Sequence, residues 1–126
     1  MIHSYKDLIV WQRAIELVVA VYDLSDKFPK EEVFGLTSQM RRAAVSIPSN
    51  IAEGRFRGTR KDFLNFIRIA YGSGAELETQ VEIARRLSKI ANLDYTKVNE
   101  LLTEVMKMLN TMLRNLGPKA SEADVS

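Results

Sequence analysis

Apolar residues recur at steps of three and four positions in four stretches of the chain, separated by short polar breaks. This spacing places them on one side of an α-helix, so each stretch predicts an amphipathic helix. The predicted helices span about residues 6–26, 36–55, 60–91 and 95–116. Long amphipathic helices joined by short links pack as bundles. The pattern therefore predicts an all-α fold, an antiparallel up-and-down four-helix bundle.

Prolines and glycines mark the breaks in this pattern. Pro48 lies in the middle of the second predicted helix, where it removes a backbone donor, so we expect a kink there. Gly117 and Pro118 stop the fourth helix. Residues 1–117 are therefore predicted to form one bundle, and the small, polar residues 118–126 a disordered C-terminal tail.

Two sets of apolar residues do not fit one buried side per helix. Ile9 and Val19 lie beside or among the polar positions of the first helix, and Ile69, Ile83 and Ile90 form a line off the main seam of the third. Singly exposed apolar residues are normal in soluble proteins, and a partner chain that covers them is the alternative. We predict a closed homo-oligomer from this surplus.

The third predicted helix contains Gly72, Ser73 and Gly74 in its interior. Glycine destabilises a helix interior by about 0.5–1 kcal/mol, so a close approach of a neighbouring helix is the expected compensation. That neighbour belongs either to the same bundle or to another chain.

The composition excludes several kinds of protein. None of the 126 residues is cysteine, which excludes disulfides, thiolate metal sites and a cysteine nucleophile. No segment reads as a signal peptide or a membrane span, because even the most apolar stretch, residues 8–24, contains three charged side chains. We therefore expect a soluble, cytoplasmic protein without membrane contact.

The sequence offers no set of residues suited to catalysis. Its one histidine, His3, lies near the N-terminus, and acidic pairs such as Glu78 and Glu82 alternate with basic residues. Such alternation is typical of a solvated helix surface with ion pairs. We predict a protein that is not an enzyme and has no metal, cofactor or small-molecule substrate.

The net charge of +2 is unevenly distributed, since residues 35–61 carry six basic side chains and one acidic, or +5, and the remainder carries −3. The densest part is a turn between the second and third helices. This basic turn consists of Arg55, Arg57, Arg60 and Lys61. Arginine forks match phosphate oxygens, and Phe56 within the turn can stack on an unpaired base. A second cluster contains Arg85 and Arg86. Both clusters are candidate nucleic-acid contacts, and a solvated link between helices is the alternative for the turn.

A line of polar residues follows one side of the second helix at steps of three and four. It consists of Gln39, Arg42, Ser46, Asn50 and Glu53, with Glu76 and Gln80 on the third helix as natural partners. The line predicts either a binding groove or a hydrogen-bonded polar seam between helices or subunits, and buried polar groups favour the seam.

Several of these segments carry a family resemblance. The chain reads DLIVWQ at residues 7–12, GLTSQMRRAAVSIPSNIAEG at 35–54, GS at 72–73 and ELETQ at 76–80. Over about residues 5–116 it resembles the four-helix-bundle family of proteins encoded in 23S rRNA intervening sequences, and more distantly the accessory protein of diversity-generating retroelements. The resemblance implies a homopentameric ring and a role in binding RNA or other nucleic acid. It carries no catalytic residues.

Two functional hypotheses follow. The first is a non-enzymatic oligomeric protein that binds RNA or DNA through its basic clusters, which the local charge of +5 favours. The second is a structural or adaptor bundle that binds another protein and has no nucleic-acid role, which the small net charge favours.

Overall fold

The computed structural model describes residues 4–116, apart from the side chains of residues 33 and 34. This part of the chain contains four α-helices and no β-strand. The helices are α1 (Ile9–Ser25), α2 (Ser38–Arg57), α3 (Arg60–Arg86) and α4 (Thr96–Leu116). They form a four-helix bundle, which confirms the predicted all-α fold. The tail predicted at residues 118–126 lies outside the described residues.

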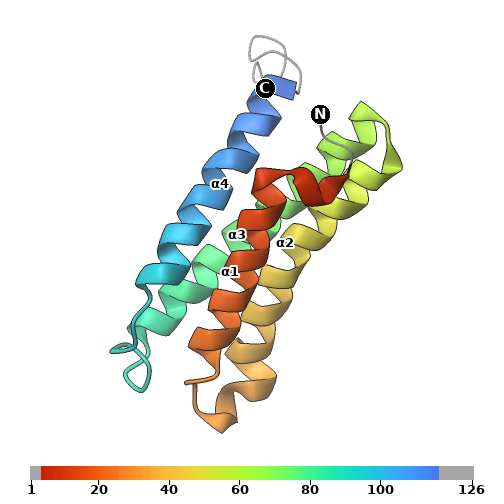
Figure 1. The fold of residues 1–126 in the computed structure, drawn as a ribbon. Coiled ribbons are helices and arrows are strands. Elements are labelled where there is room, and N and C mark those ends of the chain that lie inside the picture. Colours follow the sequence, from red (N-terminus) through yellow and green to blue (C-terminus); the bar gives the residue numbers. More distant parts are fainter. Residues whose placement is uncertain (1–3, 117–126) are drawn as a thin grey trace, which may run out of the picture.

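The four helices pack in a closed circuit. Each helix contacts the next one along the chain, and α4 returns to contact α1. In Figure 1 the chain runs down α1, up α2, down α3 and up α4. The turn between α2 and α3 therefore lies at the same end of the bundle as the last turn of α4.

Apolar side chains from all four helices fill the space between them. Leu17, Ile47, Leu77 and Val105, one from each helix, are completely buried. Burial of a side chain of this size stabilises the fold by about 1.5–3 kcal/mol. The three- and four-residue repeat thus marks the buried sides of α3 and α4. It was wrong in α1, where Ile15 lies on the predicted buried side and is 38% exposed.

The second helix begins later than the sequence predicts. A 3-10 turn at Lys30–Glu32 is followed by a wider helical turn at Val33–Thr37, which Gly35 interrupts with a non-helical backbone (φ −102°, ψ −111°). Regular α-helix starts only after this turn and then continues past Pro48 to its end at Arg57. The kink expected at Pro48 stays a prediction.

The third helix ends five residues before the predicted position 91. Leu87 has an extended backbone (φ −86°, ψ 123°), and turns replace the helix after it. This change of direction brings Ile90 into the core, where it is 2% exposed and its carbonyl accepts a 2.9 Å hydrogen bond from the Tyr95 hydroxyl. The predicted line of Ile69, Ile83 and Ile90 is therefore wrong at Ile90, because burial of this residue outweighs continuation of the helix.

Two helix glycines occupy close contacts between helices. A Cβ atom at Gly74 would overlap Sδ of Met106 on α4, and one at Gly54 would lie 2.7 Å from Cβ of Phe66 on α3. The close approach predicted for Gly74 is therefore confirmed, and the neighbour belongs to the same bundle. Gly72 differs, because a Cβ there would meet no atom within 4 Å.

Candidate nucleic-acid interface

The basic turn joins α2 to α3 at one end of the bundle (Figure 1). α2 ends because Gly58 adopts the left-handed backbone that glycine favours (φ 85°). α3 starts immediately afterwards, since Oγ1 of Thr59 accepts a 3.1 Å hydrogen bond from the amide of Asp62. This short connection brings the four cations together, and all are exposed: Arg55, Arg57, Arg60 and Lys61.

Arg57 is held in a defined orientation. Its Nε donates a 2.9 Å hydrogen bond to Oε2 of Glu53, one turn earlier on α2. Its guanidinium also lies 5.1 Å from the centre of the Phe66 ring on α3. Both charged side chains of the ion pair are about half exposed, and exposed pairs of this kind are worth only about 0–1 kcal/mol. The pair with Glu53 therefore leaves Arg57 able to exchange its partner for a phosphate.

Arg60 also contacts the end of α4. Its Nε donates a 2.8 Å hydrogen bond to the main-chain oxygen of Leu116, and its Nη2 contacts the same oxygen. The end of α4 carries unpaired carbonyls and a partial negative charge, which a cation stabilises. Charge patterning alone did not indicate this role, because the two residues are 56 positions apart.

The basic turn has a net positive charge even when its acidic neighbours are counted. From Glu53 to Asp62 there are four basic and two acidic residues, a net charge of +2. The carbonyl that accepts from Arg60 carries no full charge, so the guanidinium remains a cation in the local field. Cations that surround an exposed turn attract phosphate groups.

The second predicted cluster is more nearly neutralised. Nε of Arg86 donates a 2.8 Å hydrogen bond to Oε2 of Glu82, and Arg85 lies 4.0 Å from the same carboxylate. The hydrogen bond from Arg86 is the main cause of a lowered Glu82 pKa. Nearby, Nζ of Lys89 lies 3.6 Å from Oε2 of Glu31. The structure thus places Arg85 and Arg86 in an ion-paired surface, about 40 Å from the basic turn along α3.

The predicted polar line divides into a seam and a solvated part. The hydroxyls of Ser46 and Ser73 lie 2.8 Å apart across α2 and α3, and the Asn50 amide donates to the hydroxyl (2.9 Å) and the carbonyl (2.7 Å) of Ser46. Gln80 is buried, and its Oε1 has no partner among the described residues. The other members of the line are exposed: Gln39, Arg42, Glu53 and Glu76.

Sequence reasoning missed Ser73 as the partner of Ser46. The signal available in the sequence was its position between Gly72 and Gly74, in a part of the third helix where close approach was already expected. Because α2 and α3 lie close together there, the short side chain of Ser73 reaches the hydroxyl of Ser46. Glu76, which was expected as the partner, is exposed instead.

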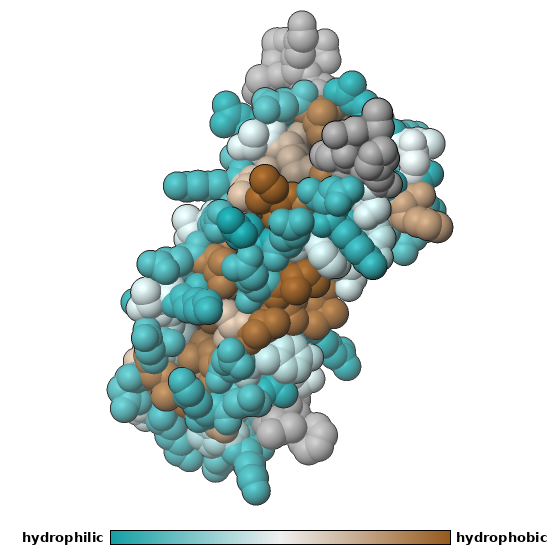
Figure 2. Space-filling model, in the orientation of Figure 1, coloured by the Kyte–Doolittle hydropathy of each residue, from teal (hydrophilic) through white to brown (hydrophobic). Residues whose placement is uncertain are grey.

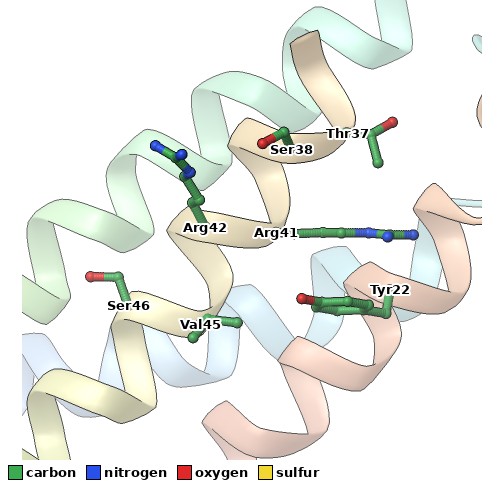
Figure 3. A pocket seen from close by; sticks show the side chains of 7 residues that line it. All are labelled: Tyr22, Thr37, Ser38, Arg41, Arg42, Val45 and Ser46. Carbon is green, nitrogen blue, oxygen red and sulfur yellow. The ribbon is translucent and has the colours of Figure 1, made fainter. Parts of the chain in front are cut away.

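A groove of about 550 Å³ lies between α1 and α2 beside this seam, and Figure 3 shows its lining. The guanidinium of Arg41 lies 4.4 Å above the centre of the Tyr22 ring and donates to Ser25 and Asp26, both at 2.8 Å. The labelled polar groups of Thr37, Arg42 and Ser46 point in different directions (Figure 3). The groove therefore lacks the convergent polar groups typical of a small-molecule site.

An apolar stripe crosses the outer surface of α1 and meets α2. It consists of Ile15, Val19, Tyr22 and Val45, which are between 38% and 55% exposed. Figure 2 shows apolar surface over the middle of the face that α1 occupies in Figure 1. Exposed apolar patches of this kind mark interaction surfaces. Val19 and Ile9, both predicted as surplus, are indeed among the exposed apolar residues, as are Ile69 and Ile83 on α3.

Neither a membrane-spanning helix nor a metal-binding group of acidic side chains is present among the described residues. None of the helices there is long and apolar enough to cross a membrane. Within residues 4–116 the carboxylates form no group of three or more that is able to hold a metal ion.

Comparison with known proteins identifies relatives. The sequence model of the family described as 23S rRNA-intervening sequence protein matches residues 6–111. The chain is also similar to a crystal structure of a protein with unknown function from the S23 ribosomal protein family of Bacteroides thetaiotaomicron. The identity is 27%, the TM-score is 0.75, and the match covers 84% of this chain and 99% of the other. No curated protein matches the chain.

Proposed function

The chain belongs to the family of 23S rRNA-intervening sequence proteins, and from this we propose that it is a non-enzymatic, self-assembling bundle that binds RNA through its basic turn. The observation that carries the proposal is the concentration of four exposed cations in one turn with a net charge of +2. Phosphate contacts of this type supply affinity and little sequence preference.

The two clusters contribute unequally in this proposal. The basic turn combines two exposed cations, Arg55 and Lys61, with the oriented guanidinium of Arg57. Arg85 and Arg86 are only two cations, and they share the carboxylate of Glu82, so these three residues carry a net charge of +1. We therefore assign the main contact to the basic turn and a smaller one to the far end of α3.

Self-assembly strengthens such binding without new kinds of contact. The apolar stripe on α1 and α2 supports an interface with a second copy, and the family resemblance favours five copies in a ring. Several basic turns held on one assembly contact one RNA together, which raises the overall affinity through effective concentration. No cofactor or small-molecule substrate enters this proposal.

The experiment is a titration of structured RNA at several salt concentrations. The test variant replaces Arg55, Arg57 and Lys61 with Ser and keeps Arg60, because Arg60 also holds the end of α4. The matched control replaces Arg85 and Arg86 with Ser. Each phosphate contact contributes about 0.7–0.9 to the slope of log affinity against log salt, so the test variant should lose affinity and about 2 units of slope.

The control variant should retain most of the parent affinity and slope. If the test variant binds RNA as tightly as the parent, with the same salt slope, the basic turn is only a solvated link. The same conclusion follows if the parent binds no RNA at low salt.

One observation favours the alternative, an adaptor that binds another protein. Val19 is 55% exposed in the middle of the stripe, and its neighbours Ile15 and Tyr22 are also exposed. This surface is apolar, whereas a phosphate site needs positive charge. If the parent assembles but binds no RNA, the adaptor function is favoured, and the apolar stripe is the surface that binds the partner protein.

A further inference from the structure

Phe56 has the largest exposed fraction, 83%, among the large apolar side chains of the described residues. It lies in the last turn of α2, between Arg55 and Arg57 in the sequence. A phenyl ring in water forgoes the stabilisation that burial would give it, so a binding partner is the expected use of such a ring.

The ring stands on a rigid part of the fold. α2 is helical through Arg57, and only then does Gly58 turn the chain. On the far side of the turn, Arg60 is joined to the end of α4. The backbone that carries Phe56 is therefore fixed, and little conformational entropy is lost when a ligand meets the ring.

The surroundings of Phe56 determine the chemistry of its ligand. The cations beside it attract negative charge, and its ring packs against a flat, apolar group. The ligand therefore has to carry both features close together. A nucleotide whose base is unpaired has both features, because its base exposes a flat ring beside its phosphate. In a duplex the bases remain stacked on one another, so a duplex offers only phosphates to the same turn.

We infer that Phe56 stacks on an unpaired base, so that the basic turn binds single-stranded or looped RNA more tightly than duplex RNA. This inference rests on the proposed function, since it names the class of RNA that the proposed site selects. Phosphate contacts from the cations position the strand, and the ring adds a contact that only an unpaired base is able to make.

The test compares a short uridine oligomer with a fully paired RNA duplex of the same length. Phe56→Ala and Phe56→Leu both remove the aromatic face, and Phe56→Tyr keeps it. Both non-aromatic variants should lose about 5- to 150-fold in affinity for the uridine oligomer. Phe56→Tyr should bind it like the parent, and all the variants should bind the duplex equally.

The control is Leu87→Ala, which removes an exposed apolar side chain just after the other end of α3. It should bind both RNAs like the parent. Thermal melting of each variant checks the fold, which should be unchanged because Phe56 makes so little contact with the rest of the bundle.

The outcomes separate this inference from the proposed function. If the parent binds oligomer and duplex equally and Phe56→Ala changes neither, the stacking inference is wrong, while salt-dependent binding still supports the proposed function. If Phe56→Leu binds like the parent, the contact is apolar but not stacking, and the inference is again overturned. If the parent binds neither RNA, both ideas are wrong.

Discussion

The guanidinium of Arg60 donates hydrogen bonds to the main-chain oxygen of Leu116, so the first turn of α3 is joined to the last turn of α4. Both groups belong to the end of the bundle that carries the basic turn. A residue that charge alone would assign to ligand binding therefore also stabilises the fold.

Arg60→Ala should lower the free energy of unfolding by about 0.5–1.5 kcal/mol, since it removes charge-assisted hydrogen bonds to an exposed helix end. Urea unfolding followed by circular dichroism measures the change. Lys61→Ala, one position later, is the matched control and should leave stability within about 0.5 kcal/mol. Equal urea midpoints for the two variants would show that the contact with Leu116 contributes nothing.

The glycines of α3 should respond in opposite directions. Gly74→Leu forces side-chain atoms against Met106 and should destabilise the bundle by about 1–3 kcal/mol through overpacking. Gly72→Ala should stabilise it by about 0.5–1 kcal/mol, because a Cβ there meets no atom and alanine favours the helix. Thermal melting measures both. A lower melting temperature for Gly72→Ala would indicate a close contact that another chain makes in the assembly.

Asp94 should make the start of α4 sensitive to acid. Its Oδ1 accepts a 2.9 Å hydrogen bond from the amide of Thr96, which is the main cause that lowers the Asp94 pKa below its usual 3.8. A carboxylate with a lowered pKa in the folded state adds stability above its unfolded pKa, and this stability is lost as the pH falls through the folded pKa.

The variant Asp94→Asn keeps an oxygen that accepts the hydrogen bond and removes the charge. It should be less stable than the parent at neutral pH, and the difference should disappear in acid, below the lowered pKa. Urea unfolding across this pH range measures it. A stability difference that is constant with pH would mean that the charge of Asp94 plays no part.

The sequence predicted the helices well where the apolar pattern and the backbone agree. Three- and four-residue spacing identified the buried sides of α3 and α4, where Leu77 and Val105 fall on it and are completely buried. In α1 the same spacing marked Ile15 for burial, which was wrong, because Ile15 is 38% exposed and Leu17 packs into the core instead. The end of α3 was not predictable in the same way. No glycine or proline marks Leu87, and the chain leaves the helix there because Ile90 and Tyr95 are buried over the end of the bundle.

The candidate site shows the same division. Ion pairs between residues four apart, Arg57 with Glu53 and Arg86 with Glu82, follow from helical spacing alone. The contact of Arg60 with Leu116 depends on how α3 and α4 pack, and no local pattern contains that information. Sequence therefore located the cations, and tertiary structure distinguished those that also serve the fold.

The last prediction concerns assembly through the apolar stripe. Light scattering should give the parent a mass that is a multiple of 14.3 kDa, with five copies favoured by the family resemblance. Val19→Glu places a charge in the middle of the stripe and should dissociate the assembly, because burying an unpaired carboxylate is costly. The bundle itself should stay folded, since Val19 is more than half exposed in the single chain.

Ile83→Glu is the matched variant on α3, where Ile83 is 45% exposed. Dissociation by Val19→Glu alone would place the interface on α1 and α2. Dissociation by both would mean that two different surfaces meet, as in a ring in which each copy presents one surface to the copy before it and another to the copy after it. A parent that scatters as a single chain at micromolar concentration would refute the assembly, and the exposed stripe would then be left for a different protein.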